Sequence, residues 1–158
     1  MLWTKFAEQE PDLAERGRLL LAEEHGYVYL STVTAEGSPR LHPVAPILGD
    51  RGLYVAVKRR SPKLVDLRSD PRIALHSTVL PPDDEEFSVR GVVREVEDAG
   101  ARQAAVIGAR GGAQLCSALA LFEVDLLEVG WARWSQGKPT RKRWRAEGVR
   151  LTTQDTVL

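Results

Sequence analysis

Short runs of aliphatic, β-branched and aromatic residues recur along most of this chain, and each run ends at a turn sequence. They lie at Tyr27–Thr34, Arg40–Leu48, Leu53–Val57, Ile73–Thr78, Phe87–Val96, Leu119–Trp134 and Lys142–Ala146. This composition is typical of β-strands, and the short spacing favours antiparallel neighbours. Helical patterns occur only at about Pro11–Glu24, directly after Ser61 and at Asp98–Gly108. We therefore predict a mainly β fold with helical covers, an antiparallel barrel of six or seven strands.

The length of 158 residues suits one domain with its own core. No repeat or low-complexity segment divides the sequence, so we expect a single unit. It comprises a helix at about 11–25, the barrel at about 27–146 and a loose tail at 149–158. The longest apolar stretch, Ala118–Phe122, is far below the about 18 residues that span a bilayer, and the first residues lack an apolar leader pattern. We expect a cytoplasmic protein.

The charges balance, with 22 basic and 22 acidic residues, so an anionic ligand must be attracted by a local patch. The best candidate is the segment Val57–Lys63, in which three cations leave a strand and meet a helix start. Ser61 is a helix cap and Pro62 occupies the first helical position. Free amides, the helix dipole and the lysines together predict a phosphate site. The alternative is a solvated basic turn with a routine serine cap.

The predicted strand at Arg40–Leu48 carries Pro43 and Pro46. Proline lacks an amide hydrogen, so this strand cannot pair normally along both edges, and part of its backbone is free to face a ligand. Arg40 and His42 share one face by strand alternation and can both point at that ligand. The alternative is that His42 is a satisfied structural histidine. No Ser-His-Asp order, paired carboxylates, phosphate-binding glycine loop or metal-ligand spacing accompanies it.

A basic and aromatic run lies near the C-terminus, at Trp131–Arg145. If 141–145 is a strand, Arg141, Arg143 and Arg145 line one face and Lys142 and Trp144 the other. An arginine row with nearby tryptophans suits a phosphate and a flat aromatic ring. The same composition suits single-stranded nucleic acid, or a solvated edge kept basic to prevent edge pairing.

The order of these segments resembles the pyridoxamine 5'-phosphate oxidase-like family of FMN-binding split β-barrels. The resemblance extends from about Leu20 to Gly148. It depends on three segments, STVTAEGSPRLHPVAP, LYVAVKRRSPKLVDLRSDPRIAL and WSQGKPTRKRWR. It implies a homodimer with the flavin at the interface, no membrane or nucleic-acid partner, and a small-molecule substrate.

The resemblance also implies roles for particular residues. Ser61 and Lys63 correspond to the residues that hold the flavin phosphate. The second strand passes along the flavin, through Arg40, His42 and the backbone of Val44. From the partner chain, Trp134 and Arg145 contact the flavin and Arg141 the substrate. Lys58 and Arg145 also hold the phosphate. With Val57 as a further cofactor-binding residue and Arg143 as a further substrate-binding residue, these are our predicted site residues.

The resemblance implies an FMN-binding oxidoreductase that transfers hydride to or from a small organic substrate, with no metal and no assigned acid or base. Arg143 stands where the oxidase proper has a histidine, which favours the broader flavin and deazaflavin reductases over oxidation of pyridoxamine phosphate. The alternatives are a coenzyme F-420-dependent reductase and a non-catalytic protein that binds flavin or haem. A nucleic-acid module is supported only by the C-terminal run.

Overall fold

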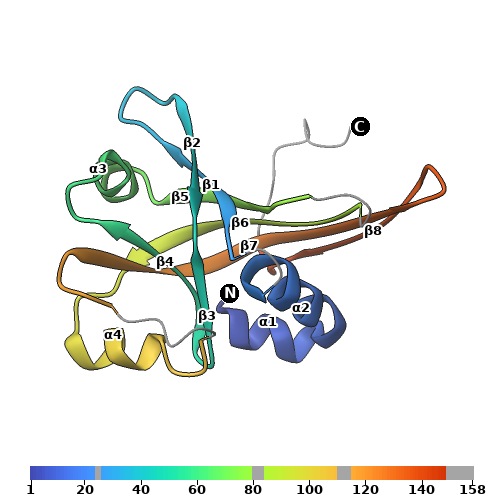
Figure 1. Cartoon of the computed structure of the whole chain (residues 1–158), viewed down its shortest axis with the longest axis horizontal. Helices are drawn as coiled ribbons and strands as arrows, with labels where there is room; N and C mark the ends of the chain where they lie inside the picture. Colours follow the sequence, from blue (N-terminus) through green and yellow to red (C-terminus); the bar gives the residue numbers. More distant parts are fainter. Residues whose placement is uncertain (24–25, 80–83, 110–114, 149–158) are drawn as a thin grey trace.

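A computed structural model of the chain, which describes residues 1–23, 26–79, 84–109 and 115–148, is built around one antiparallel sheet (Figure 1). Its strands are β1 (Val28–Val33), β2 (Pro39–Val44), β3 (Pro46–Gly49), β4 (Gly52–Lys58), β5 (Arg72–Ser77), β6 (Glu85–Glu95), β7 (Leu119–Ser135) and β8 (Lys138–Arg145). Their order is β2-β1-β5-β6-β7-β4-β3, and β8 also pairs with β7. The predicted mainly antiparallel barrel with helical covers is confirmed.

The described residues contain eight strands where six or seven were predicted, because the proline-bearing segment is two strands. β2 pairs with β1, whereas β3 pairs with β4, so the chain changes partner at Ala45. In the described part of the chain, no ladder joins β2 to β3 or adds a strand to the other edge of β2. The barrel is therefore open beside β2, where the prolines predicted an unpaired edge.

Five short helical segments cover the sheet: α1 (Trp3–Gln9), α2 (Pro11–Arg18), the π-helix η1 (Leu19–Glu23), α3 (Pro62–Ser69) and α4 (Ala99–Ala105). α2 with η1, α3 and α4 correspond to the predicted helices, and α1 was not predicted. In Figure 1, α1 and α2 lie below the sheet. The helix α3 lies at the upper left, near β2. The largest core cluster joins Trp3 and Phe6 of α1 to Phe87 of β6.

Gly17 lies where α2 meets this core. A Cβ added there would lie 2.5 Å from Cζ of Phe87 and 2.7 Å from Cη2 of Trp3. The glycine therefore permits close packing of α2 on the barrel, although glycine weakens the helical pattern in the sequence.

β7 and β8 form a long hairpin that projects from the body of the molecule (Figure 1, right). Gln136 and Gly137 connect them, with φ of 50° and 74°. Two positive φ angles are typical of the type I′ turn, which matches the twist of a hairpin. β8 begins at Lys138, earlier than the predicted Lys142. The predicted tail at 149–158 lies outside the described residues.

None of the helices in the described segments is long and apolar enough to cross a bilayer.

Candidate functional site

The predicted helix cap at the start of α3 is present. The Ser61 side chain accepts a hydrogen bond from the Lys63 backbone N–H at 3.3 Å, and Pro62 is the first helical residue. Lys58, the last residue of β4, and Arg60, on the turn that follows, are both exposed. Arg59 is bound elsewhere, because its Nε donates to the Ser117 carbonyl at 3.1 Å. The basic turn and the helix start are thus together on one edge of the barrel.

A cavity of about 460 Å³ lies between this turn and the β1–β2 turn. Thr34–Glu36 line one side of it and Arg59–Pro62 the other. Arg40 and Asp66 also line it. The cavity places Arg60 and Ser61 beside the acidic residues Glu36 and Asp66, whereas the predicted residues Lys58, Lys63 and His42 are not among those that line it.

Arg40 and His42 share one face of β2, as predicted, and lie opposite Thr32 and Leu30 of β1. Leu30 is fully buried, so this face is the inner face of the barrel. The Arg40 guanidinium Nη1 lies 3.3 Å from Oδ2 of Asp66. Arg40 is therefore already paired with a carboxylate, which the sequence pattern did not indicate.

The Nε2 atom of His42 is buried and, within the described structure, has no hydrogen-bond partner. Burial lowers the pKa of His42, as do the positive charges of Lys63 and Arg40, while Asp66 opposes the change. The imidazole is therefore neutral near pH 7. An unsatisfied buried nitrogen costs about 1–3 kcal/mol, which a ligand atom can recover. Of the predicted site residues, His42 most directly indicates a bound group.

The side chains of Val44 and Val57 belong to the core and are 7% and 2% exposed. They can contact a ligand only through their backbone. The sequence predicts a backbone contact for Val44, and the burial of Val57 leaves it the same kind of contact.

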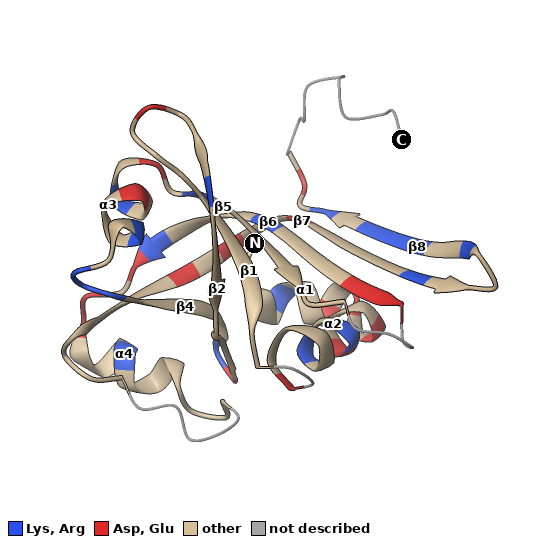
Figure 2. Cartoon of the chain, turned by 45° about the horizontal axis from the view of Figure 1, so that its top comes forward, with Lys and Arg blue, Asp and Glu red and all other residues tan. Residues whose placement is uncertain are grey.

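The remaining predicted residues lie on the β7–β8 hairpin. The Arg141 guanidinium carbon lies 5.9 Å from the centre of the Trp134 ring. Nε of Arg145 donates to Glu128 at 2.8 Å, and Nε of Arg143 lies 3.7 Å from the same carboxylate. The run is therefore not a row of free cations, although β8 is coloured mostly as basic in Figure 2.

The predicted alternation along β8 is present. Arg141, Arg143 and Arg145 are exposed, and Trp144 is half-buried against the core. The Trp144 ring centre lies 4.9 Å from that of Phe6, and Lys142 pairs with Glu10.

The predicted residues form two groups, which lie on opposite sides of the folded molecule (Figure 1). Ser61, Lys63 and His42 lie around α3 and β2, whereas Trp134 and Arg141 lie on the projecting hairpin. One copy of the chain does not bring them together.

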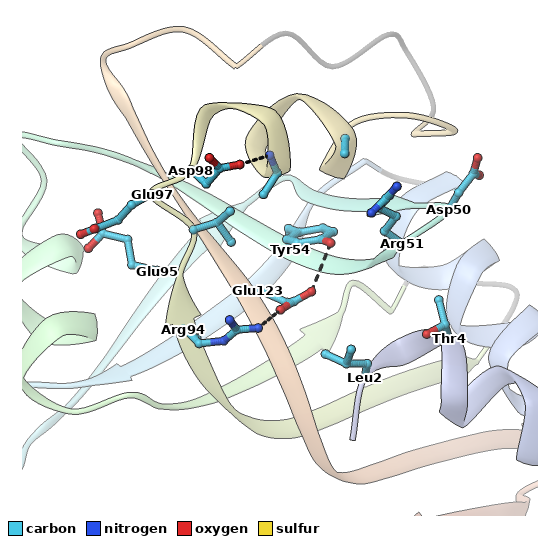
Figure 3. Close-up of a pocket in the computed structure, with 13 residues that line it drawn as sticks. Leu2, Thr4, Asp50, Arg51, Tyr54, Arg94, Glu95, Glu97, Asp98 and Glu123 are labelled. Carbon is cyan, nitrogen blue, oxygen red and sulfur yellow. Dashed lines mark hydrogen bonds and ion pairs between the residues drawn. The ribbon is translucent and has the colours of Figure 1, made fainter.

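A second cavity, of about 520 Å³, lies beside α4 and contains no predicted site residue (Figure 3). The Tyr54 hydroxyl donates to Glu123 at 3.2 Å, and Arg94 pairs with the same carboxylate. Burial and Glu123 raise the pKa of Tyr54 to about 12, so it remains a phenol. Asp98 caps α4 by accepting from Ala101 N–H at 2.7 Å. These groups satisfy one another and do not indicate a ligand.

Comparison with known proteins agrees with the fold. A family model described as pyridoxamine 5'-phosphate oxidase matches residues 18–139. No curated protein matches the sequence.

Several solved structures are similar. The haem-binding protein from Mycobacterium smegmatis aligns with a TM-score of 0.64 and 19% identity, over 84% of this chain and 58% of that one. PhzG from Burkholderia lata 383, in complex with tetrahydrophenazine-1-carboxylic acid, has a TM-score of 0.60 and 15% identity, over 92% and 87%. An F420 reductase has a TM-score of 0.52 and 17% identity, over 72% and 94%.

The chain thus spans little more than half the length of the M. smegmatis protein. At these identities the structures establish the fold alone. The family model, which covers most of the chain, confirms the resemblance found in the sequence: this protein belongs to the pyridoxamine 5'-phosphate oxidase family of split β-barrels.

Proposed function

We propose that this protein binds FMN at the start of α3 and along β2, and uses it to transfer hydride to or from a small organic substrate. The observation that carries the proposal is the buried Nε2 of His42, which has no hydrogen-bond partner among the described residues. The positive charge of Lys63 lowers the pKa of this imidazole. A hydrogen-bonding anionic ligand would satisfy both residues. Family membership supports the same ligand class.

The flavin phosphate would be held by Ser61, Lys63 and Lys58. The Ser61 oxygen accepts from the Lys63 N–H, so its hydroxyl hydrogen is free to donate to a phosphate. Charge-assisted bonds from lysine and the helix dipole add to this attraction.

The flavin ring would lie beside β2. His42 faces it as a neutral imidazole. The edge of β2 that no other described strand pairs with offers backbone groups around Val44. The isoalloxazine ring supplies the hydride chemistry when it is bound. The residues of this chain bind and orient it and exclude water, and we assign none of them as an acid or base.

We propose that the site is completed by a second copy of the chain. Trp134 and Arg145 belong to the β7–β8 hairpin, which projects on the side of the molecule away from α3 (Figure 1), so another copy's hairpin would supply them. The outer face of β1 and β2 supports such a dimer, because it exposes Tyr29 and Leu41, which are 44% and 65% exposed. Large apolar side chains grouped on one sheet face are typical of an interface.

We propose that the substrate is anionic and contacts Arg141, with Arg143 nearby. Arg143 and Arg145 share Glu128, whereas the Arg141 guanidinium lies over the Trp134 ring. Arg141 is therefore the better placed of the three to bind a carboxylate or phosphate above an aromatic ring.

His42 also supports a second candidate, haem binding. A neutral imidazole with an unpartnered nitrogen is the form that ligates iron. A haem-binding protein is among the structures with this fold. Coenzyme F-420 is a further candidate cofactor, since an F420 reductase also has this fold.

The test is the visible spectrum of the freshly purified protein, followed by mass spectrometry of the small molecule released on denaturation. Flavin bands and released FMN support the proposal. A Soret band that disappears in His42→Ala supports haem. A colourless protein that binds added F-420 but not FMN supports the deazaflavin reductase, and one that binds none of the three contradicts all of these candidates.

A further inference from the structure

Asp66 is a buried carboxylate behind the proposed phosphate site. It lies on α3 and is 4% exposed. The Thr32 hydroxyl, itself fully buried, donates to its Oδ2 at 2.8 Å. Arg40 Nη1 lies 3.3 Å from the same oxygen. One carboxylate therefore joins α3 to both β1 and β2.

Such a cluster constrains the elements that carry it. A buried charge is tolerated when it is paired and hydrogen-bonded, and removing one partner leaves the other uncompensated. Thr32 and Arg40 lie opposite each other in the β1–β2 register, so Asp66 contacts two adjacent strands at one point. α3 is thereby fixed against this part of the sheet.

The position of Asp66 relates it to both parts of the proposed site. It follows Lys63 by three residues on α3, about one helical turn after the phosphate-binding end. Its partner Arg40 precedes His42 by two residues on the same face of β2. The Asp66–Arg40 pair thus spans the space between the residues proposed for the phosphate and those proposed for the ring.

We propose that Asp66 is a positioning residue, which holds the phosphate-binding start of α3 at a fixed distance from the flavin-facing side of β2 by pairing with Arg40 and Thr32. The inference rests on the proposed function. It assigns Arg40 a different role from the one expected from the sequence, because its guanidinium is engaged by Asp66 and supports β2 instead of holding the cofactor.

The cluster also has an electrostatic effect that a purely structural role would not have. His42 is acted on by Lys63 and Arg40, which lower its pKa, and by Asp66, which raises it. Replacing Asp66 by asparagine keeps an acceptor for Thr32 and removes the negative charge. The pKa of His42 should then fall further in the protein without cofactor.

The experiment compares two ligands in Asp66→Asn and Arg40→Met. Inorganic phosphate contacts only the α3 part of the site, whereas FMN spans both parts. We expect the Kd of FMN, from fluorescence titration, to rise at least tenfold in both variants. The Kd of phosphate, from competition or NMR titration, should change less than threefold. The double variant should be no worse than either single one, because both changes break the same pair.

Asp70→Asn is the matched control. It removes an exposed Asp–Arg pair with Arg72 at the other end of the same helix, and FMN binding should be unchanged. Circular dichroism of all variants checks folding. Arg40→Met changes a partly exposed side chain, so it keeps the test usable if Asp66→Asn does not fold.

Equal loss of phosphate and FMN binding in the variants would overturn the positioning role, and so would unchanged FMN binding. If the wild-type protein does not bind FMN, the proposed function fails, and the NMR titration of His42 still tests whether Asp66 acts on the His42 side of β2. A lower pKa of His42 in Asp66→Asn than in wild type and Asp70→Asn then supports the electrostatic cluster, and an unchanged value overturns it.

Discussion

At the scale of single residues, the proposed phosphate site depends on where each cation points. The local charge pattern does not distinguish Lys58, Arg59, Arg60 and Lys63, although the family resemblance selects Lys58 and Lys63. In the structure Arg59 donates to the Ser117 carbonyl, and Arg40 pairs with Asp66. Lys63 acts on His42, so it is the cation that we expect to contribute most to flavin binding.

Lys63→Ala should weaken FMN binding by about 10- to 100-fold without unfolding the protein. A charge-assisted contact to phosphate contributes on the order of 1.5–3 kcal/mol. Fluorescence titration measures the affinity, with Lys5→Ala as the matched control because Lys5 is an exposed lysine on α1 that lines neither cavity. Unchanged affinity in Lys63→Ala, or an equal loss in the control, would rule out this assignment.

The lowered pKa of His42 predicts a pH dependence of stability. In the unfolded chain His42 binds a proton with a pKa near 6.5. In the folded protein its pKa is lower, so protonation favours the unfolded state. The contribution of His42 to stability is therefore complete above about pH 6.5 and declines as the pH falls toward its lower folded pKa.

The melting temperature, recorded from about pH 7.5 to about pH 5.5, tests this dependence. It should fall less steeply in His42→Gln than in the wild-type protein. Parallel curves for the two proteins would contradict the prediction.

At the scale of elements, the sequence predicted the helices and turns that are determined by residues close together in the chain. Ser61 and Pro62 begin α3 because a cap and a first-turn proline act within one helical turn. The seven-residue helix α1 lacks a side-chain cap and an acidic first turn, so nothing local indicates it. Packing of Trp3 and Phe6 on the barrel stabilises it instead.

Other features depend on partners that are distant in the sequence. Prolines indicated an unpaired edge at β2, but the change of partner at Ala45 depends on β4, which pairs with β3. Asp66 looks like an ordinary helix-surface acid in the sequence. Its burial is evident only in the structure, where Thr32 and Arg40 contact its carboxylate.

Gly17→Ala should destabilise the protein by about 1–3 kcal/mol, because the added methyl would overlap the buried rings of Phe87 and Trp3. Chemical denaturation followed by circular dichroism measures the free energy of unfolding. Gly100→Ala in α4 is the control, because its methyl would meet only the Asp98 carboxylate. Equal stability of Gly17→Ala and the wild type would show that α2 can move away from the barrel.

At the scale of the whole molecule, the two groups of predicted residues lie at opposite ends of the chain, and the dimer proposed above explains this arrangement. Leu41→Asp places a charge on the exposed outer face of β2. We expect this variant to have a monomeric mass by light scattering after size-exclusion chromatography. The fractions that contain the monomer should contain no flavin. A monomeric wild-type protein that retains flavin would contradict the shared site.

Complementation tests the sharing directly. Lys63→Ala and Trp134→Ala should each bind flavin poorly, because each removes one side of every site. When the two variants are unfolded together and refolded, a mixed dimer contains one intact site, so part of the flavin binding should return. If the refolded mixture binds no more flavin than the separate variants, the two groups of residues do not belong to the same site.

The prolines of β2 have a further consequence for an open barrel. A strand with a free edge can template the addition of a strand from another molecule, which leads to aggregation. Pro39 and Pro43 lie four residues apart on this edge strand, and neither has an N–H to donate to an added strand. The opening that leaves β2 accessible to a small molecule is therefore protected against the start of an intermolecular sheet.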